Sequence, residues 1–356
     1  MRQKLILPLL CSGVLLAQQL PPDVVPPFVV TTERVVAPVT VFDRDGGYVN
    51  GIKADQFHLY DNGKEQNIAV DVSYQPISVV IAIESSSHVE AILPQVQKIG
   101  NLITPLVIGD QGEAAVMAFD SRIRTLQDFT NNPDLITQAI KKIQPGSNAN
   151  RIVDAAVEAA RMLTHQPQNR RRIILLVSET RDLGSESRAR EALIDLQLGN
   201  IVLYGVDMSR LVSTITAPPE EPRPFSQPPT AYTLPGGVPS TPTTVAQTYG
   251  GNGGRAEFTP LMLEVLKDVK YIFKNNPVEL FTKGTGGSEF GFYRQKGLEE
   301  AMQKIGEELH SQYILTYSPN NKLEGGFHQI QVEVEGRPDV KKVVTRPGYW
   351  MAAKPG

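Results

Sequence analysis

The stretch that decides the fold is Val79-Val80-Ile81-Ala82-Ile83-Glu84-Ser85-Ser86-Ser87-His88. Its first five residues are apolar and β-branched or small, which predicts a strand buried on both faces. An acidic residue and a run of hydroxyls follow, and a helical pattern then extends from about residue 89 to 106. Open α/β sheets place ligands at the carboxyl ends of such strands, and oxygen-rich turns suit hard cations. We therefore expect a parallel sheet with a functional edge after Ile83.

Two further apolar runs, residues 173–177 and 201–206, also lack polar alternation, so we expect them to be parallel central strands beside residues 79–83. The other predicted elements are strands at 113–119, 123–127 and 313–317 and helices at 132–143, 150–164, 186–197, 259–274 and 298–310. This alternation predicts an α/β fold with a doubly wound, mostly parallel sheet covered on both faces. A glycine-rich turn is expected at 281–287, without the pattern of a phosphate-binding loop.

Small β modules are expected at both ends of this α/β region, which itself spans residues 76–318. The first module, residues 34–75, has turn signals at Asp45-Gly46-Gly47 and at Tyr60-Asp61-Asn62-Gly63. Its predicted strands are 35–42, 56–60 and 66–72. The second module, residues 319–356, predicts a β-hairpin extension with strands at 327–334 and 340–346.

The first residues predict an export signal. Residues 1–17 combine two basic residues, an apolar core and Ala17 as a cleavage position, and residues 18–33 predict an extended segment. Cleavage would remove Cys11, the only cysteine, which would exclude disulfides and thiol chemistry from the mature chain. The apolar core is too short to span a bilayer comfortably. We expect an exported protein, periplasmic or extracellular, with no transmembrane span after signal removal.

Composition narrows the choice of partners. Hydrophobic residues make up 41% and charged residues 21% of the 356, as in ordinary soluble proteins. The net charge of −3 gives no reason to expect a nucleic-acid partner. Residues 211–257 contain nine prolines and a glycine-rich end, so we expect an extended Pro/Gly-rich insertion there. A proline-rich docking segment is the alternative.

The order of elements across 76–318 resembles the von Willebrand factor A domain. The flanks sharpen this resemblance. Asp55-Gln56-Phe57 and Asp61-Asn62-Gly63 precede the domain, and Tyr313-Ile314-Leu315-Thr316-Tyr317 and Arg346-Pro347-Gly348-Tyr349 stand at its end and beyond. With them, nearly the whole chain resembles an exported VWFA-related family catalogued mainly from Acidobacteria. The resemblance implies a von Willebrand A-like fold with small β flanks and an adhesion or binding function.

The A-domain family usually binds Mg²⁺ or Mn²⁺ at a metal-ion-dependent adhesion site, with an Asp-x-Ser-x-Ser motif, a Thr and a later Asp. The corresponding positions here hold Glu84, Ser86, His88, Asn150 and Glu179. Only Ser86 is retained, and each glutamate moves its carboxylate by about 1.5 Å, one C–C bond. The histidine nitrogen suits Mn²⁺ or Zn²⁺ better than Mg²⁺. We expect a degenerate site, with a genuine divalent site (Mn²⁺, Zn²⁺ or Mg²⁺) as the alternative.

Enzymatic activity is not expected. Ser86 and His88 are two residues apart on one turn, a poor arrangement for a nucleophile and its base, and no Gly-x-Ser-x-Gly elbow occurs. We predict a non-catalytic exported binding protein that holds a protein or other macromolecular ligand at the face lined by the five site residues. The alternatives are a structural envelope component without a metal site and a secreted hydrolase.

Overall fold

A computed structural model describes residues 34–71, 75–167, 169–209, 276–291, 295–321 and 324–351. The chain divides into the units Met1–Thr31 and Thr32–Gly356, and all described residues belong to the second. The predicted signal peptide, the extended segment 18–33, the insertion 211–257 and the helix 259–274 lie outside the described residues. Within the described ranges, no helix is long and apolar enough to cross a membrane.

The larger sheet has six strands in the order β10-β9-β8-β5-β6-β7. Its strands are β5 (Ile77–Glu84), β6 (Glu113–Phe119), β7 (Ile123–Thr130), β8 (Arg171–Ser178), β9 (Ile201–Asp207) and β10 (Glu289–Gly291). All neighbours are parallel except β6 and β7. The predicted parallel central strands are therefore confirmed. Because Ile83 pairs with Val177, β5 and β8 end side by side.

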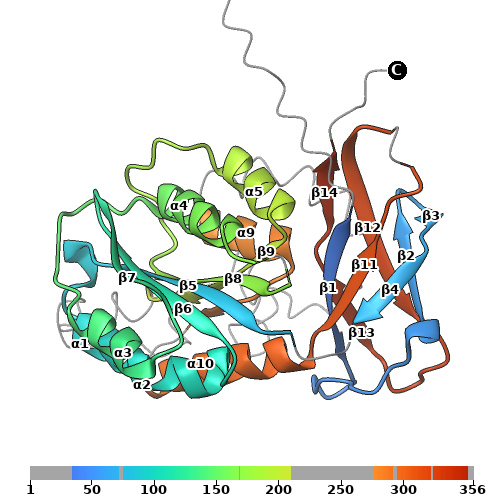
Figure 1. Ribbon diagram of the computed structural model, residues 1–356, viewed down its shortest axis with the longest axis horizontal. Helices are drawn as coiled ribbons and strands as arrows, with labels where there is room; N and C mark the ends of the chain where they lie inside the picture. Colours follow the sequence, from blue (N-terminus) through green and yellow to red (C-terminus); the bar gives the residue numbers. More distant parts are fainter. Residues whose placement is uncertain are drawn as a thin grey trace, which may run out of the picture. The chain divides into compact units, whose positions relative to one another are not determined.

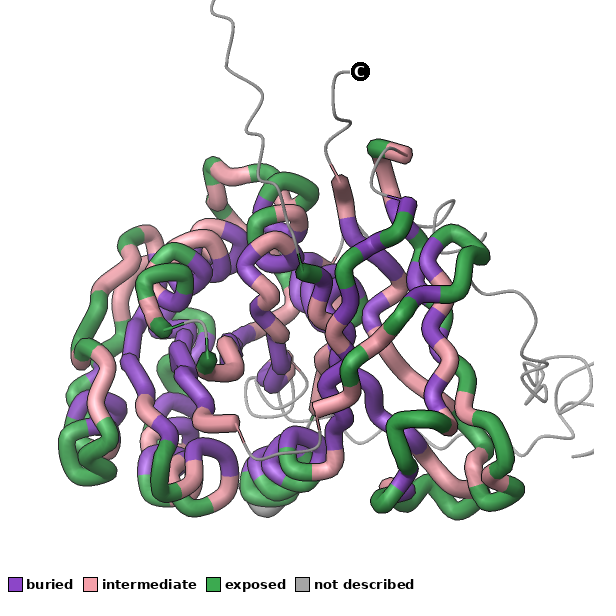
Figure 2. Tube along the Cα trace, turned by 45° about the vertical axis from the view of Figure 1, so that its right-hand side comes forward, coloured by how far each residue is buried: buried purple, intermediate pink, exposed green. Residues whose placement is uncertain are grey.

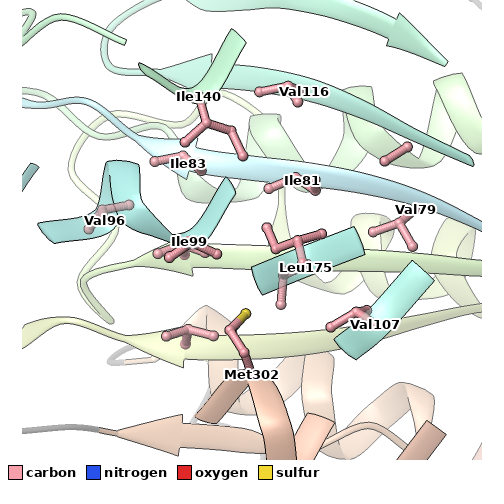
Figure 3. Packing of buried hydrophobic residues seen from close by; sticks show 14 of the residues in the cluster. Val79, Ile81, Ile83, Val96, Ile99, Val107, Val116, Ile140, Leu175 and Met302 are labelled. Atoms are coloured by element: carbon pink, nitrogen blue, oxygen red, sulfur yellow. The ribbon is translucent and has the colours of Figure 1, made fainter. Parts of the chain in front are cut away.

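Helices cover both faces of this sheet (Figure 1). One face carries α1 (Leu93–Val96), α2 (Gly100–Ile103), α3 (Pro133–Lys141) and α10 (Gln295–Ser311), and the other carries α4 (Ile152–Thr164), α5 (Ala189–Leu198) and α9 (Pro277–Thr285). Successive strand residues point to opposite faces, so Val79, Ile81 and Ile83 pack beneath the first set (Figure 3). Val80 and Ala82 pack beneath the second set. Glu84 continues this alternation on the α4 side.

The continuous helix expected over 89–106 is wrong. The segment instead breaks into a 3-10 turn at Ser87–Val89, α1, a second 3-10 turn at Gln97–Ile99, α2 and a π turn at Thr104–Ile108. Pro94 and Pro105 lack the N–H that a continuous helix needs at these places. Buried apolar side chains still recur along the segment, so tertiary packing holds the broken pieces on the sheet. Figure 2 colours the chain by burial and shows exposed positions concentrated in loops and turns.

The glycine-rich turn expected at 281–287 is mostly helix. Asn276 caps α9, since its Oδ1 accepts from the Glu279 N–H at 3.0 Å, and Pro277 occupies the first turn. The helix ends at Gly286, whose φ of 82° is left-handed. A Cβ on Gly286 would lie 3.1 Å from the backbone nitrogen of Arg346. Asn276, Pro277 and Gly286 are residue types typical of helix ends, but the glycines within residues 281–287 favoured the prediction of a turn.

The two flanking modules form one β domain. Its sheets are β13-β1-β11-β4 and β14-β12-β2-β3. The strands are β1 (Val35–Phe42), β2 (Phe57–Asp61), β3 (Lys64–Glu65), β4 (Ile68–Asp71), β11 (Tyr313–Tyr317), β12 (Gly326–Val334), β13 (Lys342–Thr345) and β14 (Gly348–Met351). Two expectations are corrected here. Residues 313–317 pair with β1 and β4 rather than closing the α/β sheet, and the expected C-terminal hairpin does not form, because β12 and β13 lie in different sheets. Buried side chains from residues 35–59 and 313–349 share one apolar core, which explains why strands from both flanking modules pair with one another.

A fully buried carboxylate, Asp61, lies inside the β domain. It accepts hydrogen bonds from His328 Nδ1 at 2.7 Å, Tyr317 Oη at 2.9 Å, Tyr349 Oη at 2.7 Å and Asn321 Nδ2 at 3.1 Å. Burial raises the pKa of both tyrosines, so they remain hydroxyl donors. Four segments of the β domain therefore meet at one acceptor.

Arg346 connects this cluster with the α/β domain. Its guanidinium lies 5.5 Å from the Tyr349 ring centroid and donates to the Gln197 carbonyl of α5 at 3.4 Å. Burial lowers the pKa of Arg346 to about 10, opposed by the nearby Tyr317, Tyr349 and Asp61. Arg346 remains a cation at neutral pH, and its charge interacts with the buried Asp61 carboxylate.

Candidate functional site

The predicted site residues lie at the carboxyl edge of the larger sheet. We call this surface the carboxyl-edge face; it comprises the loops at 85–92, 120–122, 144–151 and 179–188. Glu84 is the last residue of β5, Asn150 precedes α4, and Glu179 follows β8. Glu84 and Glu179 were expected at one edge of the sheet, and the side-by-side ends of β5 and β8 confirm this.

Glu84 is fully buried, and hydrogen bonds from three segments hold its carboxylate. Oε1 accepts from Ser86 Oγ at 2.5 Å and from Asn150 Nδ2 at 3.2 Å, and Oε2 accepts from the Glu179 N–H at 2.7 Å. Burial raises the pKa of Glu84, and these three hydrogen bonds oppose the rise. Four of the five predicted residues therefore meet in one closed network.

His88 stands at the exposed rim of this network. Its Nδ1 lies 3.7 Å from Glu179 Oε2, and the two side chains are 41% and 17% exposed. Burial raises the pKa of Glu179, and the neighbouring His88 opposes that rise. The Ser86 hydroxyl donates to Glu84.

A second buried carboxylate, Asp120, was not among the predicted site residues. It follows β6, is fully buried, and accepts from the Arg122 N–H at 2.7 Å. Arg124 donates both to Asp120 Oδ2 at 3.2 Å and to Ser85 Oγ at 3.1 Å. A Cβ on Gly146 would lie 1.7 Å from Asp120 Oδ2, so only glycine fits there. The sequence signal was an acidic residue directly after a buried strand.

The loop after β8 caps the start of α4, which was also not predicted. Asp182 Oδ1 accepts from the Val153 N–H at 3.2 Å, and Ser185 Oγ accepts from the same N–H at 3.0 Å. In return, Asp154 Oδ1 accepts from the Ser187 N–H at 2.8 Å. Carboxylates at a helix N-terminus satisfy free N–H groups and the helix dipole. Asp154 and Asp182 therefore join the loop after β8 to the first turn of α4.

As arranged in the structure, these residues do not fit the divalent ion that the resemblance implies. The Ser86 hydroxyl points to Glu84, and both Glu84 oxygens already accept from protein donors. Among the described residues of this set, Asn150 Oδ1 is a buried oxygen without a hydrogen-bond partner. Across the described ranges, no group of three His, Cys, Asp or Glu side chains could hold an ion. A metal would need at least Ser86 and Glu84 to rearrange.

Residues 79–181 match the sequence profile of the von Willebrand factor type A domain. This segment is a von Willebrand A-like domain. The matched residues contain β5 from Val79 onward, β6, β7 and β8, α3 and α4, and all five predicted site residues. With the mostly parallel sheet and the flanking strands, they establish the von Willebrand A fold that the sequence predicted.

Several solved structures resemble the chain at low identity. The von Willebrand domain of a type V pili tip protein from Porphyromonas gingivalis is 18% identical over 31% of this chain and 40% of its own, with a TM-score of 0.26. An aerotolerance-related membrane protein from Bacteroides fragilis is 14% identical over 65% and 99%, with a TM-score of 0.38. A proximal thread matrix protein from the mussel byssus, solved with a zinc-occupied adhesion-site motif, is 12% identical over 70% and 49%, with a TM-score of 0.39. The chain thus spans less than half of the pili tip domain. No curated protein matches the chain.

Proposed function

We propose that this chain is a non-catalytic, exported binding protein whose carboxyl-edge face holds a macromolecular ligand without a divalent ion. The observation that carries the proposal is the closed network around Glu84. Its carboxylate is buried and bound by Ser86, Asn150 and the Glu179 backbone, so the groups that would face an ion are occupied by the protein. Contact with a ligand then falls to the exposed side chains of the surrounding loops.

Two features support a binding role for this face. Backbone hydrogen bonds join the loop 85–92 to the loop 144–151. The Ser87 N–H donates to the Ser147 carbonyl at 2.8 Å, and the Gly146 N–H donates to the Ser85 carbonyl at 2.7 Å. Preorganised loops lose little conformational freedom when a ligand binds. The same loops expose Ser87, His88 and Asn148 to solvent. A rigid frame with exposed polar side chains favours recognition over chemistry.

Site-specific photo-cross-linking in cells that produce the protein tests the proposal. A photoreactive amino acid replaces Ser87 or Asn148, which are exposed on the carboxyl-edge face, and Asp110 serves as the control on the opposite edge, before β6. We expect a discrete adduct from the two face positions, unchanged by EDTA, and none from Asp110. Adducts that vanish in EDTA would contradict metal-free binding. Equal adducts from all three positions, or none from the face, would contradict the assignment of the face.

Calorimetry tests the metal statement separately. Titration of the purified protein with MgCl₂, MnCl₂ or ZnCl₂ at millimolar concentration is expected to give no binding heat, because Glu84 and Ser86 are engaged with each other. A ligand that binds the folded state stabilises it by mass action. A rise in melting temperature that Glu84→Gln abolishes would therefore show that an ion does enter the network.

A further inference from the structure

A recess lies beside α9 at the β10 end of the larger sheet, where α9 packs against β9 (Figure 1). Its volume is about 580 Å³, and its lining comes from the end of β9, from Asn276 and α9, and from residues 287–291. Pockets of about 300–1,000 Å³ are typical of small-molecule sites. We call it the α9 recess. Its lining residues lie outside the four loops of the carboxyl-edge face.

Acidic side chains outnumber basic ones in the α9 recess. Asp207, Glu279 and Glu289 line it together with one cation, Lys283. The Lys283 ammonium pairs with Glu279 Oε1 at 2.5 Å. Within the described ranges, neither Asp207 nor Glu289 forms a salt bridge. Burial raises the pKa of Glu289, and the nearby Asp207 and Glu279 raise it further, while Asn276 and Lys283 oppose the rise. The recess therefore holds two carboxylates that no basic side chain pairs with.

The strand register brings Asp207 and Glu289 to the same face of the sheet. Glu289 pairs with Gly205 of β9, and Asp207 is the second residue after Gly205. A Cβ on Gly205 would lie 2.5 Å from Val278 of α9 and 3.4 Å from Glu289 Cγ, so this face is the one that α9 covers. The spacing of strands and residues puts the Cα atoms of Asp207 and Glu289 about 8 Å apart. A single cationic group fits between two carboxylates at this separation.

A buried hydroxyl without a partner stands in the same row of the sheet. Ser178 of β8 pairs with Asp207. The alternate residues of β8 before it, Ile174 and Leu176, pack in one core with α9, so the Ser178 side chain is directed to that side as well. Ser178 is 1% exposed, and its Oγ has no hydrogen-bond partner. Buried polar groups nearly always have one. This hydroxyl is therefore an acceptor beside Asp207 that the described chain does not use.

These groups suit an organic cation better than a metal ion. In the part of the chain that the structure describes, no three His, Cys, Asp or Glu side chains are arranged to hold a metal ion. Ammonium and guanidinium groups instead carry several N–H donors, which can reach separate acceptors at once. Hydrogen bonds between such cations and carboxylates are among the strong ones in proteins. The volume of the recess also leaves room for an alkyl chain.

We propose that the α9 recess binds an alkyl ammonium or alkyl guanidinium group between Asp207 and Glu289. The site is independent of the proposed function, since it uses none of the residues of the carboxyl-edge face. Lys283 is an internal competitor, because its ammonium neutralises Glu279 and repels a second cation. A free small amine and the basic side chain of a peptide share this chemistry, and the choice of probes distinguishes these two sources.

Calorimetry at low salt tests the proposal. The probes are butylguanidine, its uncharged isostere butylurea, and a blocked Gly-Arg-Gly peptide. The test variant is D207N/E289Q, which keeps the side-chain shapes, and the matched control is D110N/E299Q, which removes two exposed carboxylates elsewhere. We expect butylguanidine to bind roughly tenfold or more weakly to D207N/E289Q and within about twofold of the natural affinity to D110N/E299Q. Lys283→Gln should bind it about twofold or more tightly, because the competing cation is gone.

The outcomes separate the two sources and the failures. Tighter binding of the peptide than of butylguanidine would assign the recess to a basic polypeptide segment, and the reverse order to a free amine. Equal binding of butylurea, no binding heat with butylguanidine, an unchanged affinity in D207N/E289Q, an equal loss in D110N/E299Q or weaker binding to Lys283→Gln would each overturn the proposal. Circular dichroism checks that each variant is folded. If D207N/E289Q is not, Lys283→Gln still decides, since that side chain is 65% exposed.

Discussion

Replacing Asp61 by alanine is expected to destabilise the protein strongly. The change leaves two tyrosine hydroxyls, His328 Nδ1 and an Asn321 amide without their buried acceptor. It also removes the anion that faces the buried guanidinium of Arg346. Breaking a buried charge cluster by deleting one partner costs about 3–5 kcal/mol. At about 2–4 °C per kcal/mol for a large domain, the melting temperature should fall by about 6–20 °C.

Urea unfolding, followed by circular dichroism and by the fluorescence of the single tryptophan, Trp350, measures this loss. Asp55→Ala is the matched control, since Asp55 is exposed in the same β domain and should change the free energy of unfolding by less than about 0.5 kcal/mol. Asp61→Asn keeps the shape but removes the charge, so we expect an intermediate loss of about 1–3 kcal/mol. A loss below about 1 kcal/mol for Asp61→Ala would refute the reasoning, because the cluster would then tolerate an absent acceptor.

Three further predictions concern the α/β domain and its contact with β14. Burial raises the pKa of Glu84, so between the ordinary glutamate pKa and the raised value the folded state holds a proton that the unfolded chain has released. The free energy of unfolding therefore falls as pH rises through that interval. Glu84→Gln should flatten this fall in urea titrations from pH 4 to 8. An unchanged pH slope in the variant would contradict the burial of this carboxyl. Gly146→Ala should cost about 1–3 kcal/mol in thermal unfolding, because its Cβ would lie 1.7 Å from Asp120 Oδ2, and a neutral result would mean that the loop moves freely. Arg190→Ala should shift the Trp350 emission to the red while costing at most about 1 kcal/mol, since the guanidinium lies 4.8 Å from the ring centroid, and an unshifted spectrum would argue against that stacking.

The central sheet could be predicted because its signal is local. Residues 79–83, 173–177 and 201–206 are apolar without alternation, and such runs occur where helices cover both faces of a sheet. The helix at 89–106 failed for a local reason as well, since Pro94 and Pro105 interrupt the hydrogen-bond ladder while the apolar spacing continues. Periodicity reports which side is buried, and backbone chemistry decides the type of element.

The β domain could not be predicted in the same way, because its pairings join distant parts of the sequence. Strand β11 is buried at every residue except Thr316, and nothing within it specifies β1 as its partner. The flanking segments singled out by resemblance contain Asp61, Tyr317, Arg346 and Tyr349, which the structure brings into one cluster. Their contact depends on three-dimensional closure, which local pattern does not encode. The narrower resemblance to an exported Acidobacteria-type family stays a prediction.

For the candidate site, the sequence predicted which residues would meet and left open what they would bind. Alignment of strand ends brings Glu84, Asn150 and Glu179 together. Whether the Ser86 hydroxyl faces an ion or a carboxylate depends on shifts of about 1.5 Å, the length of one added methylene. In the structure, the Ser86 hydroxyl donates a hydrogen bond to the Glu84 carboxylate.

The von Willebrand A-like domain is inserted between β4 and β11 of the β domain, and this has a consequence for the order of folding. Strand β1 pairs Val39 with Tyr313, so the first β sheet closes a loop that contains the whole α/β sheet. Such non-local pairing is slow, because the entropy of loop closure is lost before the stabilising contacts between the strands form. On the ribosome, β5 to β9 are synthesised long before β11 to β14, and β1 and β2 must wait with their apolar faces uncovered. We therefore expect the β domain to fold last, so chaperones that protect exposed strands would have most time to act on β1 and β2.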